Sequence, residues 1–308
     1  MELRQLRYFV RVVEAGSIGR AAMSLGMVTS ALSQQISRLE GELSTRLLQR
    51  SASGVVPTDA GLAFFRQAQL ALRHADDAVT AAQQARLAGH VSVGLPSTTA
   101  AILGAPFLQA MNERYPDIRL HLVEALSGHL ADMLNGRLLD LAIVFHAESA
   151  RRWSIMPLLD EPLYLCARRD MPGVPDGDTT RLDAIAHLPL VLPSGRHGLR
   201  ALVNNAFQQM GQTPRVVAEV DGLSLLMDVV QLGNAATIQP SSATARIAPG
   251  QLHMARIDDA HLFRPNLLAS LSDDELSPAG LAARLVLADV SRTLARDGKW
   301  AVVALHES

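Results

Sequence analysis

Two stripes of side chains run at helical spacing through residues 28–43. The apolar stripe recurs every three or four positions, which places it on one side of a helix as a seam to be buried: Leu32, Ile36, Leu39 and Leu43. The second stripe is polar, nearly uncharged and lies on another face: Ser30, Ser33, Gln34 and Ser37. A Gln side chain can pair with the edge of adenine in a major groove, which is wide enough for a helix. The pattern predicts either a nucleic-acid contact face or the Ser-rich exterior of an ordinary amphipathic helix.

The residues before this helix favour nucleic-acid contact. Apolar positions at helical spacing predict a first helix that ends near Gly16: Leu3, Leu6, Phe9, Val10 and Val13. Ser17 is a typical N-cap for a short second helix that Gly26 closes, and Thr29 is the expected cap of the third helix. A short capped helix, a glycine turn and a helix with a polar contact face form the helix-turn-helix pattern.

Residues 47–58 predict a small hairpin or wing, because two short extended runs flank a Ser-Ala-Ser-Gly turn. The wing carries Arg50. An Arg at this place is expected to meet a phosphate, which positions the protein without reading sequence. The alternative is a solvated surface Arg.

A long helix is expected from Thr58, a good N-cap, to about residue 87. Its apolar positions alternate spacings of three and four, as in a heptad seam: Phe65, Ala68, Leu72, Ala75, Val79 and Ala82. We interpret the seam as a dimerisation helix, with packing against its own domain as the alternative. Two reading heads on one duplex would match a two-fold operator.

Residues 1 to about 88 resemble the N-terminal region of LysR-type transcriptional regulators. The matching positions span several elements: Leu6-Arg-Tyr-Phe, Gly16-Ser17, Ala21-Ala22, Leu25, Ala31-Leu-Ser-Gln-Gln-Ile, Leu39-Glu, Leu43, Leu47-Leu, Arg50 and Pro57-Thr-Asp-Ala-Gly61. The resemblance implies a winged helix-turn-helix, a linker-helix dimer and a C-terminal domain that binds an effector. By matching position it implies DNA contacts at Thr29, Ser30, Ser33, Gln34, Arg38 and Arg50. Thr29 and Ser30 depart from the family, where many members carry Gln followed by Pro or Ser.

The remainder of the chain alternates strand-like and helix-like segments, which predicts parallel sheets flanked by helices. The expected strands are 91–95, 118–124, 139–145, 189–192, 215–220 and 236–239, and the expected helices are 100–113, 128–135, 198–210, 222–231 and 278–296. The order resembles the two-lobed, periplasmic-binding-protein-like α/β domain of the same regulators, and its start is similar to the nitrogen assimilation control subgroup.

This resemblance gives a multidomain organisation. We expect a winged helix-turn-helix domain at 1–58, a linker and dimerisation helix at 59–88 and an effector-binding domain at 89–308. On the family template, lobe I comprises 89–162 and 266–308, and lobe II comprises 163–265.

Ligands of open parallel sheets bind beyond the carboxyl ends of the strands, where helix N-termini converge. This rule selects a set of candidate effector-binding residues: Ser97, Thr98, Thr99, Ser127, His146, Ser194 and Ser224, with Gln239 near the end of a late strand. Hydroxyl and backbone N–H groups at a helix start favour a small anion such as a carboxylate. Each hydroxyl can also be a plain N-cap, and His146 can be a strand-end histidine without a ligand role.

Composition supports this organisation without adding to it. The chain has 308 residues, 48% of them hydrophobic and 19% charged, which is ordinary for a globular protein of two or three domains. Residues 1–58 hold seven Arg and four Glu, a balance of +3, so with −2 overall the remainder carries −5. A basic N-terminal module on an acidic body suits a protein that meets phosphate with one end.

The single cysteine, Cys166, excludes an intrachain disulfide and fits a reducing compartment. Charges interrupt the apolar residues of the N-terminal stretch, which is the pattern of neither a signal peptide nor a membrane span. We therefore expect a cytoplasmic protein that does not enter a membrane.

Two other classes of protein compete with a regulator. An enzyme would need catalytic machinery, but the sequence has no nucleophile elbow, phosphate-binding loop or metal-ligand spacing, and its ten His are dispersed. A solute-binding protein would leave residues 1–88 without a role. We expect no metal and no cofactor other than an effector. The expected partners are double-stranded DNA, a small-molecule effector, further copies of the chain in a homodimer or homotetramer, and RNA polymerase, with the sign of regulation left open.

Overall fold

The computed structural model describes residues 1–51, 54–83, 88–146, 153–195, 198–248, 250–259, 262–272 and 276–306. The chain forms two compact units. The N-terminal unit is Met1–Arg86 with Gly136–Leu138, and the C-terminal unit is Leu87–Asn135 with Leu139–Ser308. Among the described residues, no helix combines the length and the apolar character that crossing a membrane requires.

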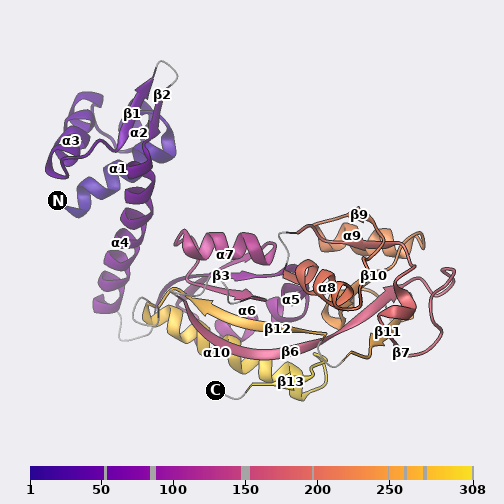
Figure 1. The fold of residues 1–308 in the computed structure, drawn as a ribbon. Helices are drawn as coiled ribbons and strands as arrows, with labels where there is room; N and C mark the ends of the chain where they lie inside the picture. Colours follow the sequence, from indigo (N-terminus) through magenta and orange to yellow (C-terminus); the bar gives the residue numbers. More distant parts are fainter. Residues whose placement is uncertain are drawn as a thin grey trace. The chain divides into compact units, whose positions relative to one another are not determined.

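The N-terminal unit contains four helices and a hairpin among its described residues (Figure 1). In chain order these are α1 (Leu3–Ala15), α2 (Ile18–Ser24), α3 (Thr29–Glu42), β1 (Leu48–Ser51), β2 (Gly54–Pro57) and α4 (Asp59–Gln83). The apolar seam of α3 is buried, as its spacing predicts: Leu32, Ile36 and Leu39 pack with Phe9, Ala21 and Ala22. The helix-turn-helix and the wing are thus present at the expected residues.

Capping differs between the helices of this unit. The Ser17 side chain accepts a hydrogen bond from the backbone N–H of Arg20, so the expected cap of α2 is confirmed. The expected cap of α3 is wrong. Thr29 is already helical, and the N-cap is Val28, which has no side-chain oxygen to offer.

The wing is tied to the end of α1 through Gly54. Its φ is +134°, and a Cβ there would lie 2.5 Å from the carbonyl oxygen of Gly16. The next residue, Val55, donates its backbone N–H to that same oxygen at 3.0 Å. Only glycine permits this close approach, so the register of the hairpin is set by contact with Gly16, at the C-terminal end of α1.

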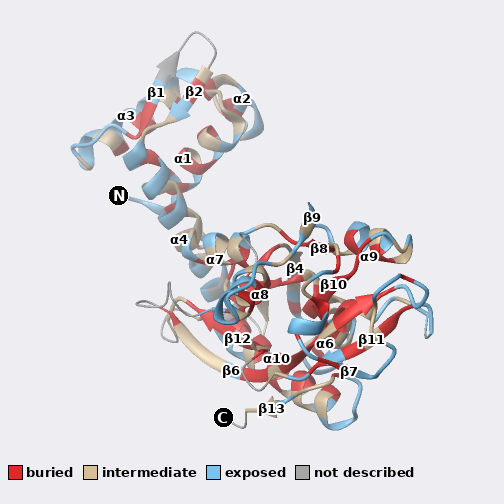
Figure 2. Cartoon of the chain, turned by 45° about the vertical axis from the view of Figure 1, so that its right-hand side comes forward, coloured by how far each residue is buried: buried red, intermediate tan, exposed pale blue. Residues whose placement is uncertain are grey.

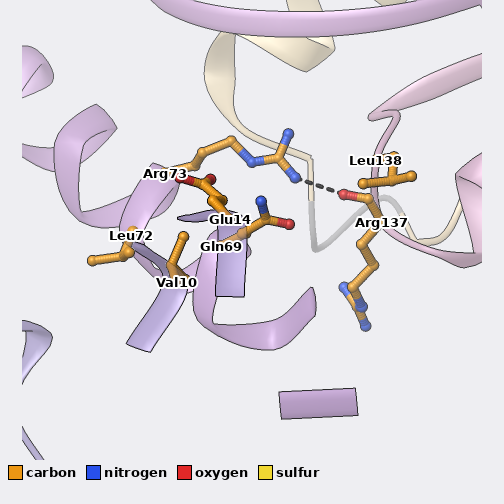
Figure 3. Close-up of a pocket in the computed structure, with 7 residues that line it drawn as sticks. All are labelled: Val10, Glu14, Gln69, Leu72, Arg73, Arg137 and Leu138. Atoms are coloured by element: carbon orange, nitrogen blue, oxygen red, sulfur yellow. Dashed lines mark hydrogen bonds between the residues drawn. The ribbon is translucent and has the colours of Figure 1, made fainter. Parts of the chain in front are cut away.

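Helix α4 packs against α1 within the unit. Ala68 is 2% exposed and lies with Leu6 and Val10, and the Phe9 and Phe64 rings meet edge to face at 5.2 Å. Figure 3 shows Leu72 of α4 beside Val10 of α1. For Ala68 the dimer expectation is therefore corrected, because its side chain is already covered by the chain's own first helix.

The C-terminal unit is built on a mixed sheet with the path order β4-β3-β5-β12-β6-β11-β7, and β10 and β13 also pair with β6. Its strands are β3 (Gly89–Leu95), β4 (Ile118–Glu124), β5 (Leu141–Val144), β6 (Ser154–Ala167), β7 (Thr179–Thr180), β8 (Leu190–Leu192), β9 (Val216–Glu219), β10 (Thr237–Pro240), β11 (His253–Ile257), β12 (Phe263–Ser270) and β13 (Ala304–Leu305).

Helices cover these strands: α5 (Ser97–Thr99), the π-helix η1 (Ala100–Gly104), α6 (Ala105–Arg114), α7 (Ser127–Asn135), η2 (Asp183–Ile185), α8 (Gly198–Gln209), α9 (Leu223–Gln231), η3 (Ser241–Thr244) and α10 (Pro278–Arg296). The expected helix at 100–113 begins earlier, at Ser97. Ser277 caps α10 as expected by accepting from the backbone N–H of Gly280 at 3.1 Å. Figure 2 shows buried residues concentrated on the strands and the inner helix faces.

The expectation of parallel sheets is only partly correct. The β3–β4, β3–β5 and β8–β9 pairs are parallel, but β12 and β6 are antiparallel to each other, and β10 and β11 are antiparallel to β6. The sequence pattern did not predict β6, β11 or β12. Pro157 and Pro162 fall inside β6 and Pro265 inside β12, and a proline usually argues against a strand because it has no N–H to donate.

Strand β6 runs from one core into the other. Its first part pairs with β12, from Ser154 opposite Ser270 to Pro162 opposite Phe263. From Leu163 onward it pairs with β10 and β11 instead. The expected division between the lobes, after residue 162, falls at this change of partner, while the domain limits as a whole stay predictions.

Candidate DNA-contact surface and effector cleft

The polar face of α3 is open. Thr29, Ser30, Gln34 and Arg38 are exposed, and Ser33 is half-buried. In the described part of the chain, the side chains of Thr29, Ser30 and Gln34 have no hydrogen-bond partner. Because the opposite stripe of the helix is anchored in the core, these side chains are held by a rigid element while their polar atoms are unused.

Arg38 lies at the edge of this face in an ionic cluster around Glu42. Its Nε donates to Oε1 of Glu42 at 3.2 Å, and the chain's own terminal ammonium lies 2.7 Å from Oε2. The hydrogen bond from that ammonium, followed by one from Gln5, holds the pKa of Glu42 below its ordinary value. Arg38 keeps 65% of its side chain exposed, so its guanidinium can also turn toward a phosphate.

The wing residue Arg50 lies in β1, opposite Val55 of β2. Its side chain lies outside the described residues. Val28, the N-cap of α3, and Met23 of α2 are 68% and 76% exposed.

The candidate effector residues lie at four places in the C-terminal unit. Ser97 and Thr98 line a small cavity, whereas Thr99 is fully buried beneath it and donates to Asn266 at 3.1 Å. Ser127 and His146 meet at one residue: the Ser127 hydroxyl accepts from the backbone N–H of Gly198 at 3.1 Å, and Nε2 of His146 lies 3.1 Å from its carbonyl oxygen.

The two remaining candidates are placed separately. Ser194 donates both its backbone N–H and its hydroxyl to the carboxylate of Asp221, at 2.8 and 3.1 Å. Ser224 lines a different hollow. The structure thus brings Ser97, Thr98 and Gln239 to one cavity and joins Ser127 to His146. Ser194 bonds Asp221 of the same cavity lining, and Ser224 lies at a separate hollow.

We call the cavity beside Ser97 and Thr98 the effector cleft. It is lined by residues from both lobes: Ser97, Thr98, Leu126, Pro193, Val220, Asp221, Leu223, Leu226 and Gln239. Its volume is about 20 Å³, room for roughly one water molecule. A ligand larger than water therefore requires the lobes to move apart. The described lining residues include the Asp221 carboxylate and no basic side chain, so the negative charge expected of the effector has no counter-charge among them. Arg196 and His197 lie outside the described residues.

Directly behind the cleft lies a buried polar network that the sequence pattern did not reveal. Glu161 of β6 and Arg264 of β12 form an ion pair, and both side chains are 0% exposed. Nη1 of Arg264 donates to the hydroxyl of Thr98 at 2.8 Å. The network therefore reaches the cleft lining through one hydrogen bond.

Every oxygen of Glu161 is used. Oε1 accepts from Trp300 at 2.6 Å and from Ser242 at 2.7 Å, while Oε2 accepts from Arg264 and, at 2.9 Å, from Asn266. The Arg264 guanidinium also stacks 4.1 Å from the centre of the Phe145 ring. Burial lowers the pKa of Arg264, and the Glu161 charge opposes that shift. A buried ion pair costs little only when its remaining groups are satisfied in this way.

A signal for the network was present in the sequence. Each strand carries charge inside an apolar run: Asp160 and Glu161 are adjacent between residues 154 and 167, and Arg264 lies between 263 and 270. Neither run was among the expected strands, and both contain proline, which is uncommon within strands. Elsewhere among the described residues, no group of three or more His, Cys, Asp or Glu is placed to hold a metal ion.

Comparison with known proteins covers both units. Residues 3–62 match the bacterial regulatory helix-turn-helix protein, lysR family, and residues 84–292 match the LysR substrate binding domain. The chain is 35% identical over 292 residues to the nitrogen assimilation regulatory protein nac of Klebsiella aerogenes, covering 93% of this chain and 94% of that protein.

Two solved structures extend the match to the fold. A point variant of full-length OxyR from Pseudomonas aeruginosa superimposes with a TM-score of 0.73 at 26% identity, covering 95% of this chain and 98% of that one. Full-length CbnR complexed with its target DNA gives a TM-score of 0.57 at 24% identity, covering 94% and 100%. The expected winged helix-turn-helix followed by a two-lobed α/β domain is confirmed, as is the similarity to nitrogen assimilation control regulators.

Proposed function

The chain belongs to the LysR family of DNA-binding transcriptional regulators, and from that premise we propose which of its residues meet DNA and effector. Membership makes it a regulator and not an enzyme. Thr29, Ser30, Ser33 and Gln34 read base edges in a major groove, and Arg38 and Arg50 contact the phosphates on either side. The observation that carries this proposal is the open face of α3, whose Gln34 is exposed and has no hydrogen bond within the described chain.

The regulator acts in the cytoplasm as a homodimer or homotetramer that engages RNA polymerase at its target genes. The dimer forms along α4 through Phe65, Leu72, Ala75 and Val79. In support, Val79 is 55% exposed and the other three are half-buried, so each retains surface to offer a partner. Ala68 is left out of this set because α1 covers it.

The effector is a small molecule that binds in the cleft beside Ser97 and Thr98. The two lobes contribute different walls of that cleft, so a ligand held there stabilises one spacing of the lobes over others. In a dimer this changes the separation of the two reading heads and the way they bend the operator. Ser127, His146, Ser194, Ser224 and the anionic character of the effector remain predictions from the sequence pattern.

A DNA-binding experiment tests the role of the polar face of α3. The purified chain is used to select fragments from genomic DNA, and the selected site is footprinted. We expect a two-fold protected site. On that site Gln34→Ala weakens specific binding relative to random DNA by about 1–3 kcal/mol, the size of a bidentate base contact.

Two further variants test whether the effect is specific to the base contact of Gln34. Gln35 is the neighbouring amide on another face of α3, so Gln35→Ala leaves specificity unchanged. Arg50→Ala weakens all sequences alike and reduces the slope of affinity against salt by about 1, because one phosphate contact is lost. An equal loss on random and selected DNA for Gln34→Ala contradicts the proposal.

A further inference from the structure

A second hollow in the C-terminal unit lies next to the effector cleft but has a different lining. Its volume is about 180 Å³, nine times that of the cleft, and Ser97 and Thr98 do not line it. Counted at roughly 30 Å³ per water molecule, it holds about six waters, so a ligand of roughly six to ten non-hydrogen atoms fits.

Three segments form its walls. Helix α9, at the orange end of the unit in Figure 1, contributes one face at helical spacing: Leu223, Ser224, Met227, Asp228 and Gln231. The segment at and after η3 contributes Ala243, Arg246 and Ile247, and Ala101 and Glu124 come from the β3–β4 side. The floor is apolar, because Met227 and Ala243 are each only 4% exposed.

The rim carries charges of both signs. Glu124, Asp228 and Arg246 all line the hollow and are exposed at its mouth. Throughout the described residues, none of these three side chains forms an ion pair or a hydrogen bond. The hollow therefore presents two carboxylates and one guanidinium whose charges have no partner within the described residues.

The guest must satisfy both signs of charge at once. A simple anion would meet Arg246 but also two carboxylates, and a simple amine would leave Arg246 without a counter-charge. We propose that this hollow, the zwitterion pocket, binds an α-amino acid with a short apolar side chain. The carboxylate of the amino acid pairs with Arg246 and its ammonium with Glu124 and Asp228, while its side chain rests on Met227.

The ligand would also bridge the two lobes. Glu124 ends β4 of one lobe, whereas Asp228 and Arg246 belong to the other. An amino acid that bridges them stabilises the closed arrangement, in which the neighbouring cleft has its small volume. Binding itself stands apart from the DNA contacts, but its use in regulation rests on the proposed function.

Calorimetric titration of the full chain tests the pocket. The probes are L-alanine, L-valine and L-leucine, with two matched analogues of valine: isovalerate, which lacks the ammonium, and isobutylamine, which lacks the carboxylate. We expect at least one of the three amino acids to bind at millimolar concentration. For L-valine we expect each analogue to bind at least about tenfold more weakly, since each loses one charge-assisted contact.

Variants locate the binding. Arg246→Gln weakens amino acid binding at least about tenfold, and Arg246→Lys recovers part of it because the charge returns without the fork. Arg215→Gln is the matched control, since Arg215 is an exposed Arg of the same lobe that does not line the pocket, and it changes nothing. The double variant Glu124→Gln with Asp228→Asn reverses the selectivity, so that isovalerate gains on L-valine.

The outcomes separate this proposal from the regulatory one. Failure of all three amino acids to bind, or binding that Arg246→Gln leaves unchanged, overturns the pocket. Selective binding of operator DNA, measured on the same preparation without amino acid, is unaffected by that failure. If the unliganded wild-type chain binds no DNA fragment selectively, the proposed function is overturned instead, whether or not the chain binds an amino acid.

Discussion

The polar face of α3 and the Glu161–Arg264 network use polar side chains in opposite ways. On α3, Gln34 is exposed and its hydrogen-bonding atoms are unused within the described chain. In the network, Glu161 and Arg264 are fully buried, and neighbouring donors occupy both oxygens of the carboxylate. The first arrangement keeps its capacity for an external partner, and the second has already used it inside the fold.

This difference predicts how each region responds to substitution. Removing a group from the network leaves a buried charge without a partner, which costs stability. Removing a group from the α3 face leaves the fold intact and costs only affinity for a partner. Tryptophan fluorescence follows unfolding of the C-terminal unit alone, because both tryptophans, Trp153 and Trp300, lie in that unit.

The largest effect is expected from Glu161→Gln. It leaves the Arg264 guanidinium buried without its counter-charge, so the free energy of unfolding of the C-terminal unit falls by about 3–5 kcal/mol. Urea unfolding followed by tryptophan fluorescence measures it. The matched control is Glu219→Gln, which breaks the pair of the exposed Glu219 carboxylate with the half-buried Arg200 and changes stability by at most about 1 kcal/mol, because Arg200 keeps its bonds to Pro193 and Asn204. A loss for Glu161→Gln as small as that of the control would show that the network is not buried in solution.

A double variant sharpens this result. Arg264→Met added to Glu161→Gln removes the charge that was left unpaired, so much of the lost stability returns. The two substitutions are therefore strongly non-additive in a double-mutant cycle. Additive losses would mean that the two side chains contribute independently.

The next effect is expected at Thr98, where network and cleft meet. Thr98→Val removes the oxygen that accepts from Arg264 and leaves a buried donor unsatisfied, at a cost of about 1–3 kcal/mol in the same fluorescence assay. Thr98→Ser keeps the oxygen and costs less. For the effector response, Ser97→Ala is the cleaner test, since Ser97 lines the cleft but has no described bond to the network. Equal losses for Val and Ser at position 98 would show that the hydrogen bond carries no weight.

A smaller effect of opposite sign is expected at Val28. Its backbone is already in the extended conformation of an N-cap, with φ −79° and ψ 141°, but it has no side-chain acceptor. Val28→Thr supplies one and stabilises α3 by about 1 kcal/mol. Amide hydrogen exchange within α3 measures the gain, and tryptophan fluorescence should not change. Unchanged or faster exchange contradicts the prediction.

The smallest effect concerns pH and Glu42. The folded state holds the pKa of this carboxyl below its ordinary value of 4.5, so the unfolded chain binds the proton first as pH falls. The stabilisation is therefore present above about pH 4.5 and is lost as pH falls below it. Far-UV circular dichroism of thermal unfolding should show a flatter acid limb for Glu42→Gln than for wild type. If stability fell with pH in the same way for Glu42→Gln and wild type, the ionic cluster around Glu42 would not contribute to acid destabilisation.

Local patterns predicted the N-terminal unit well. The buried seam of α3, the Ser17 cap and the hairpin each depend on residues a few positions apart, so their spacing alone defines them. Ala68 departs from its expectation because a heptad seam does not say which helix covers it. The chain's own α1 and a second copy satisfy the same spacing.

The network resisted prediction for a different reason. Glu161 and Arg264 lie 103 residues apart, and each looks misplaced within its own strand. Only their pairing across β6 and β12 explains why charges occur there, and that pairing comes from the tertiary fold. The same holds for the zwitterion pocket, whose charged residues belong to three separate segments.

The unbroken course of β6 through both lobes has a mechanical consequence. A loop between lobes would act as a pivot, free over a wide angle. A strand that stays hydrogen-bonded to β12 along one half and to β10 and β11 along the other resists bending at any single residue. It yields by a small twist shared among many peptide units and returns when the force is removed. Opening is thus shallow and self-reversing, and an effector has only a modest elastic resistance to overcome.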